Sequence, residues 1–148
     1  MARQSFSDKL RKIANKQLKE VDQSVCKIAR DFCHSVVELT PVGLSEYPGG
    51  LINVPGELVN NWQPAVNSIN TSLQQRPGPS KTGAHKRIDT TIVNGTFKQD
   101  GYISFTNATP YVNLAEKIGW PAPRWSGKTG PYAMVSRSIA EILSKYGY

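Results

Sequence analysis

The chain has little of what metal sites and disulfide scaffolds need. Its 148 residues hold only two cysteines and two histidines, which are Cys26, Cys33, His34 and His85. On a helix the two cysteines would share one face but lie about 10 Å apart along the axis, too far for a disulfide. A zinc site needs four ligands with closer spacing. These scarcities predict two buried free thiols, no metal and no cofactor.

The chain also lacks a long apolar run and a block of like charge. No window of about 18 apolar residues is present, and the first residues carry no apolar stretch, which predicts neither a membrane span nor a secretory signal. The Asn-x-Ser/Thr triplets at Asn70, Asn94 and Asn107 are then expected to be chance matches. The net charge of +7 is dispersed, which favours one folded domain over a disordered basic arm. A merely basic soluble protein fits this charge equally well.

Helical periodicity is strongest at the start of the chain. Between residues 7 and 39 apolar side chains recur at steps of three and four, and charged residues take most of the other positions. Ser7 is suited to cap this helix, Asp8 suits the dipole of its first turn, and Pro41 stops it. The pattern predicts a long amphipathic helix whose apolar face packs on a core, with a coiled-coil partner as the alternative.

Proline and glycine cluster between residues 41 and 131, which predicts strands joined by long loops. Residues 57–73 read as an extended segment, and Pro64 confines it to a sheet edge or a bulge. Residues 84–97 fit either a helix or a strand, and a helix ended by Gly95 is favoured.

The last part of the chain returns to regular patterns. Alternation over 101–107 predicts a strand, residues 109–120 a short helical turn, and residues 132–146 a second amphipathic helix. The predicted fold is α+β, with a long N-terminal amphipathic helix packed on a small antiparallel, barrel-like β-sheet and a C-terminal helix. It forms one domain over 1–148, divided into a long helix (1–40), strands and long loops (41–131) and the C-terminal helix (132–146).

The segment APRWSGKTGP, residues 122–131, fits the loosest pattern of a phosphate-binding loop. Such a loop needs a strand before it and a helix that begins at its lysine. Pro121 and Pro123 exclude a central strand, and Pro131 prevents a helix from beginning at Lys128. The two histidines, in the long helix and in a basic loop, have no cysteine or serine signature beside them. We therefore expect no enzymatic activity, and a nucleotide-dependent enzyme is the weakest of the alternatives.

Basic residues gather in and beside a Gly/Pro-rich loop. The candidate contacts to a DNA backbone are Arg76, Lys81, Lys86 and Arg87. A flexible basic loop of this kind contacts phosphates without reading sequence. No zinc-finger spacing, aromatic RNA-binding signature or basic zipper accompanies it, and a solvated loop explains these charges as well.

Four short motifs occur along the chain in an order that indicates a family resemblance. They are VVELTPVG (36–43), GELVNNWQ (56–63), ISFTNATPYVNLAEKIGW (103–120) and GPYAMVSRSIAEILSKYG (130–147). Together they resemble the tail-completion, or neck, proteins of tailed bacteriophages, over most of the chain. In that family a Pro-Tyr and then a Glu-x-Gly element follow a strand ending in Asn, which here are Pro110-Tyr111, Glu116 and Gly119 after Asn107. The chain departs from the family by the insertion GLSEYPGGLINVP (43–55) and by the two residues between Glu116 and Gly119, where the family often has one.

The resemblance implies a virion structural protein without enzymatic activity or membrane contact. Such a protein is made in the host cytoplasm and forms a homo-oligomeric ring, sixfold or twelvefold by analogy, that joins the head connector to the tail. Its partners are connector, stopper and tail proteins, and genomic DNA passes through the lumen without sequence-specific binding. Candidate interface residues on a proline-stiffened loop are Trp120, Pro121, Pro123, Arg124, Trp125 and Tyr132. The alternative is a stand-alone small basic DNA-binding protein.

Overall fold

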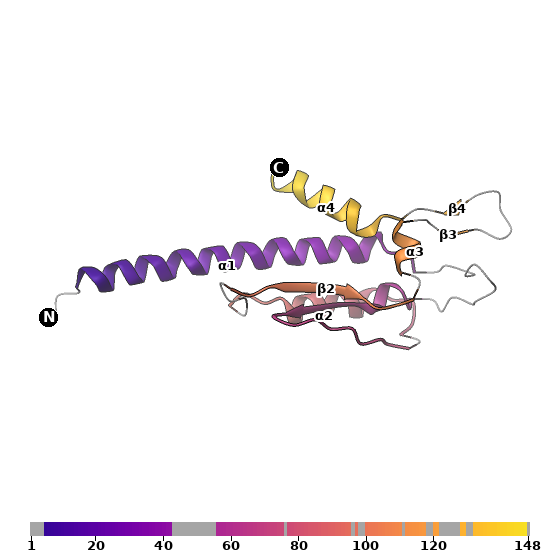
Figure 1. Ribbon diagram of the computed structural model, residues 1–148, viewed down its shortest axis with the longest axis horizontal. Helices are drawn as coiled ribbons and strands as arrows, with labels where there is room; N and C mark the ends of the chain where they lie inside the picture. The colour runs from indigo at the N-terminus through magenta and orange to yellow at the C-terminus, as the bar shows by residue number, and fades with distance from the viewer. Residues whose placement is uncertain are drawn as a thin grey trace.

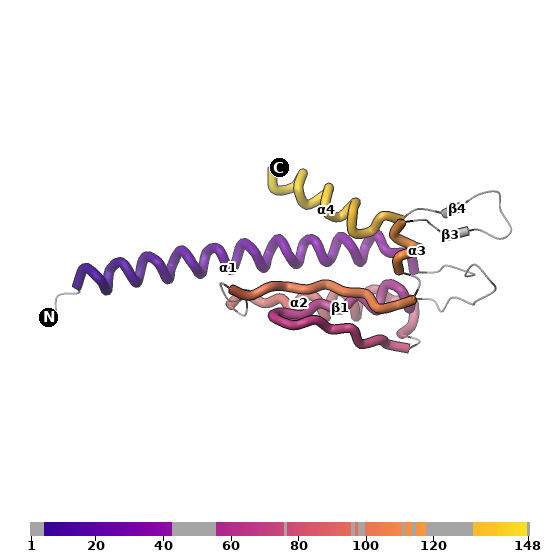
Figure 2. The backbone as a smooth tube through the Cα atoms, in the orientation of Figure 1, coloured from indigo at the N-terminus to yellow at the C-terminus, as the bar shows by residue number. Residues whose placement is uncertain are grey.

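The computed structural model has a mixed α+β architecture arranged along one long helix (Figures 1 and 2). It describes residues 5–42, 56–75, 77–95, 97, 100–110, 112–117, 120–121, 128–129 and 132–147. The helices are α1 (Phe6–Leu39), α2 (Thr82–Thr91), α3 (Val112–Lys117) and α4 (Met134–Lys145), with a 3-10 turn at Val59–Asn61. The strands are β1 (Trp62–Val66), β2 (Ile103–Asn107), β3 (Trp120–Pro121) and β4 (Lys128–Thr129).

The long helix α1 confirms the prediction made from periodicity, with a small change at its start. Its 34 residues give a rod of about 50 Å. Ser5, not the predicted Ser7, caps the helix, because the Ser5 hydroxyl accepts the N–H of Asp8 at 3.2 Å. The helix ends before Pro41, where Thr40 has extended backbone angles.

Strands β1 and β2 pair antiparallel, with Trp62 opposite Asn107 and Val66 opposite Ile103. Pro64 lies within β1, where its missing N–H is tolerated because a two-stranded sheet consists of edges. The small antiparallel sheet is therefore as predicted. Among the described residues the barrel-like closure is not found, since β1–β2 and β3–β4 are separate open pairs and two strands are too few to close.

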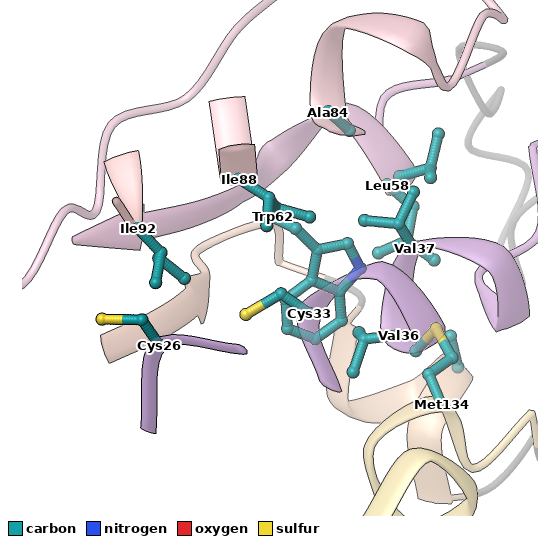
Figure 3. Close-up of a cluster of buried hydrophobic side chains, with 12 residues drawn as sticks. Cys26, Cys33, Val36, Val37, Leu58, Trp62, Ala84, Ile88, Ile92 and Met134 are labelled. Carbon is teal, nitrogen blue, oxygen red and sulfur yellow. The ribbon is translucent and has the colours of Figure 1, made fainter. Parts of the chain in front are cut away.

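The core lies where α1, β1, α2 and the start of α4 meet (Figure 3). Trp62 is at its centre and stacks on Phe105 with ring centroids 5.1 Å apart. The indole N–H donates to the hydroxyl of Thr40 at 2.9 Å, and this hydroxyl donates to the carbonyl of Val36. The other buried apolar members are Cys26, Cys33, Val36, Val37, Leu58, Val59, Ala84, Ile88, Ile92, Ala115 and Met134.

Helix α2 was predicted in outline, but its bounds were wrong. It begins two residues earlier than expected and ends at Thr91, well before Gly95. Tertiary hydrogen bonds take over at its end: Arg30 donates to the carbonyl of Ile92 at 2.7 Å, and the N–H of Gly95 donates to Asp22 at 2.7 Å. Ile92 leaves the helix with its side chain fully buried, so core packing decides where α2 stops.

The motif GELVNNWQ folds as a buried corner. Asn60 donates to the carbonyls of Gly78 and Ser80, and Asn61 donates to that of Gln74 and accepts its N–H at 2.6 Å. These amides hold the chain that follows β1 against the body without regular secondary structure. The N–H of Gly56 donates to the carbonyl of Val42, so the ends of the 43–55 insertion, which lies outside the described residues, are held together.

Candidate functional site

The N-terminal half of α1 extends beyond every other described element (Figure 1). Residues 5–20 are all exposed, although their sequence is amphipathic. At 100° per residue five apolar side chains of this half share one face. We call this set the apolar stripe, and it comprises Phe6 (77% exposed), Leu10 (50%), Ile13 (55%), Leu18 (45%) and Val21 (58%).

The same face of α1 continues into an open hollow of about 450 Å³ in the body. We call this hollow the trough. It lies between α1, α4 and the start of β2, and its walls include Ile28, Phe32, Tyr102, Ile103, Ile139 and Leu143. Ile139 and Leu143 of α4 are each 47% exposed. A smaller hollow at Leu18, Val21 and Phe97 joins the trough to the stripe.

Polar contacts on one side of α1 hold α4 in place as a wall of the trough. Asp31 accepts a hydrogen bond from the Tyr146 hydroxyl and an ion-pair contact of 2.9 Å from Lys145, and Ser35 donates to Glu141 at 2.6 Å. Burial alone would raise the pKa of Asp31, but the hydrogen bonds from Tyr146 and Lys145 outweigh it, so this pKa lies below its ordinary value. The ionised carboxylate therefore fixes the C-terminal end of α4 on α1.

The N-terminal end of α4 is fixed by Glu116 of α3. Ala133, at the cap position, has a left-handed backbone (φ 45°) and offers no side-chain cap. The carboxylate of Glu116 instead accepts the N–H groups of Val135 (3.1 Å) and Ser136 (3.2 Å), and a hydrogen bond from the Ser136 hydroxyl. Two of the sequence motifs, the one that holds Glu116 and the one that opens the last helix, are thus joined by hydrogen bonds between Glu116 and residues 133–136.

Two histidines meet between α1 and α2, which sequence analysis missed. The Nδ1 atoms of His34 and His85 are 2.6 Å apart, while the Nε2 atoms contact Asp89 (2.7 Å) and Glu38 (2.6 Å) respectively. His85 was expected in a loop, but it lies on α2 because that helix begins at Thr82. A signal was present: each histidine precedes an acidic residue by four positions, which places the two on one helix face.

The two histidine rings contact each other directly, so one Nδ1 acts as the donor and the other as the acceptor. The short Nδ1 contact leaves no room for an ion between the rings. In the described part of the chain no three His, Cys, Asp or Glu side chains are grouped so as to hold a metal. The pair ties α2 to α1.

The predicted DNA contacts do not form one basic surface in the described chain. Lys81 donates to the carbonyl of Glu38 at 2.8 Å, and Arg87 turns inward to the carbonyl of Asn60. Burial lowers the pKa of Arg87. Lys86 is exposed, and Arg76 lies outside the described residues. Two of the four predicted contacts therefore serve the fold.

The predicted interface loop is only partly described. Pro123, Arg124 and Trp125 lie outside the described residues. Trp120 and Pro121 form β3, which pairs antiparallel with Lys128–Thr129, so the segment between them joins two paired strands. Tyr132 packs against the core, and its N–H donates to Ala115 at 3.0 Å. Lys128 lies in a strand and α4 begins only at Met134, so no helix begins at this lysine.

Comparisons with known proteins add no relative to this description. A scan against family models gave no match, and neither curated proteins nor solved structures gave one. Among the described helices none has the length and apolar character needed to cross a membrane.

Proposed function

We propose that the chain is a virion structural protein of the phage neck or tail-completion type, which forms a homo-oligomeric ring around the DNA channel. The observation that carries this proposal is the unpartnered apolar surface of the isolated chain. The stripe on α1 and the exposed side chains of the trough together leave more large apolar groups in water than a monomer usually does. A subunit that is held by neighbours on two sides covers such a surface.

The order of sequence motifs supports the choice of the neck family. The Glu116 element and the segment that opens the last helix are neighbours in the family pattern, and here they are joined by hydrogen bonds from the α4 N-terminus. The contact gives these motifs a physical reason to occur together: one supplies the cap that the other lacks. This supports the resemblance by its chemistry.

The fate of the predicted DNA contacts is the one feature of the charges that favours a ring over a stand-alone DNA-binding protein. Lys81 and Arg87 are engaged within the fold, so among the described residues of segment 76–87 only Lys86 is an exposed cation from the predicted set. The exposed cations on the free half of α1, such as Lys12 and Lys16, are compatible with either function. Salt titration of DNA binding separates the two. Sub-micromolar affinity that falls steeply with salt would support the stand-alone binder and contradict the neck proposal.

We expect the ring to meet the next virion protein through the segment between β3 and β4, whose residues 122–127 lie outside the described chain. Aromatic and arginine side chains in a proline-rich sequence supply contact area at little ordering cost, and Trp125 is the residue chosen for the test. Trp125→Ala should reduce incorporation into particles and leave the melting temperature of the free subunit unchanged. A lower melting temperature would show that Trp125 packs on its own core instead.

Localisation in particles tests the proposal as a whole. Antibody or gold labelling of a C-terminal tag, viewed by electron microscopy, should place the protein between head and tail at one position per particle. Absence of the chain from purified particles would contradict the proposal.

A further inference from the structure

In the described part of the chain no residue covers the apolar stripe from Phe6 to Ile13. It lies on the free half of α1, and the trough is built in part on the other half of the same helix. A continuous rod cannot fold back on itself, and every residue from 5 to 20 is exposed. A trough that receives the stripe must therefore belong to another molecule.

The trough has the chemistry of a helix-binding groove. Of the six walls named above, only Tyr102 carries a polar atom on its side chain, and the hollow is open along α1. Pockets for small molecules carry several placed polar groups that orient the ligand. An amphipathic helix, in contrast, needs an apolar groove that receives side chains at steps of three and four residues. The stripe presents such side chains at Phe6, Leu10 and Ile13.

We propose that the apolar stripe of one copy docks into the trough of a second copy. The partner is thus a second copy of this chain, bound through residues 6–21. This inference deepens the proposed function, because it rests on self-association and names the contact that produces it. The chain carries both halves of the contact at different positions along α1, so a copy that docks its stripe still offers its trough to a further copy, which allows head-to-tail assembly and ring closure.

The contact area fits an assembly in which each copy makes the contact twice. The helical segment 6–21 is about 24 Å long, and a face covering somewhat under half of a cylinder about 10 Å wide buries on the order of 350 Å² on each side. One such contact is at the weak end for protein interfaces. A copy that both gives its stripe and receives a neighbour's buries about 700 Å² over its two contacts. In a closed assembly every copy makes both contacts, whereas the end copies of an open chain make one, so closed assemblies are favoured.

A membrane surface is the competing occupant, since a basic amphipathic helix also binds anionic lipid. It would cover the stripe of Phe6, Leu10 and Ile13 but leave Ile139 and Leu143 of the trough in water. A second copy covers both surfaces at once. The observations therefore favour the second copy, and vesicle binding becomes an outcome of the test.

The test uses one variant on each half of the contact. Ile13→Glu blocks the stripe and Leu143→Glu blocks the trough, and Lys12→Glu is the control because it changes the charge on the opposite face of α1. All three side chains are exposed in the isolated chain, so circular dichroism should show unchanged folds. By light scattering and native mass spectrometry, each blocked variant should associate at least tenfold more weakly than wild type. Lys12→Glu should keep the mass of the wild-type assembly.

Mixing the two blocked variants identifies the contact. Ile13→Glu keeps its trough and Leu143→Glu keeps its stripe, so an equal mixture should form pairs that neither variant forms alone. A mixture that stays monomeric, or a stripe variant that assembles like wild type, would overturn the inference. Wild type that remains monomeric in solution and binds vesicles of anionic lipid would overturn it in favour of the membrane.

Failure of this inference is distinguishable from failure of the proposed function. If the Ile13→Glu and Leu143→Glu variants still form wild-type rings, the docking contact is wrong while a ring protein remains. If wild type forms the docked assembly but the chain is absent from particles, the docking contact stands while the neck function is wrong.

Discussion

Replacing Glu116 by alanine should loosen the N-terminal end of α4. Its carboxylate accepts hydrogen bonds from the N–H groups of Val135 and Ser136. Ala133, at the cap position, has no side-chain acceptor that could replace it. In Glu116→Ala these donors turn to water, and the negative charge at the positive end of the helix dipole is lost. Because α4 forms one wall of the trough, the change reaches the candidate assembly surface.

The expected loss of stability follows from these contacts. Removing a helix N-cap costs about 0.5–2 kcal/mol, and removing a favourable charge from the first turn about 0.3–1 kcal/mol. Ser136 is exposed and Val135 is half-buried, so water can hydrogen-bond to the freed N–H groups and offset part of this cost. The free energy of unfolding of Glu116→Ala is therefore expected to fall by about 2 kcal/mol. Glu116→Gln keeps an acceptor and should lose about half as much. Glu20→Ala, on the exposed half of α1, is the control and should change stability by less than about 0.5 kcal/mol.

Urea unfolding followed by circular dichroism measures these differences. With a slope of about 2 kcal/mol per M, Glu116→Ala should lower the midpoint by about 1 M, and Glu116→Gln by about 0.5 M. Equal midpoints for Glu116→Ala and Glu20→Ala would refute the cap, and with it the physical link between the two motif segments.

Three substitutions and one labelling experiment test the fold. Gly56→Ala should destabilise the protein by several kcal/mol in urea unfolding, because its φ of 81° is left-handed and a Cβ there would overlap the backbone of Gly78. Gly95→Ala, with a φ of 92° and open space around it, should lose only about 1–2 kcal/mol, and an equal loss at both positions would contradict this geometry. Asp31→Asn should lose about 1 kcal/mol above about pH 5. Since the folded pKa of Asp31 lies below its ordinary value, this difference should shrink as the pH falls below about 4, and a pH-independent difference would contradict the assignment. Burial raises the pKa of Cys33 to about 12, so this thiol should not react with a thiol reagent at pH 8 until the protein unfolds, and fast labelling of the native protein would contradict its burial.

Elements with long, regular patterns could be predicted from the sequence. Helix α1 was expected over residues 7–39 and lies at Phe6–Leu39, since many turns of periodicity end at a proline. Strand β2 followed from alternation over 101–107, and Pro64 correctly confined β1 to an edge. These features depend on the local sequence, so periodicity, alternation and the positions of proline were enough to predict them.

Features that depend on tertiary contacts could not be predicted. The end of α2 is decided by the burial of Ile92 and by Arg30, which reaches its carbonyl from another helix. The crossed contacts of His34 and His85 need the relative placement of α1 and α2, which neither segment encodes alone. The exposure of the stripe was not the favoured prediction either, because periodicity favoured a core-facing helix and gave a helix with a partner only as the alternative. The other described elements cover only the C-terminal half of α1, so the apolar face of its N-terminal half is exposed (Figure 1).

The mass and symmetry of the purified protein test the central claim most directly. Native mass spectrometry with electron-microscopy class averages should show a closed ring, sixfold or twelvefold, with a central channel. Ile13→Glu should convert that ring to smaller species, while Lys12→Glu leaves it intact. A wild-type protein that remains monomeric at every concentration tested would contradict the ring and the docking of the stripe together.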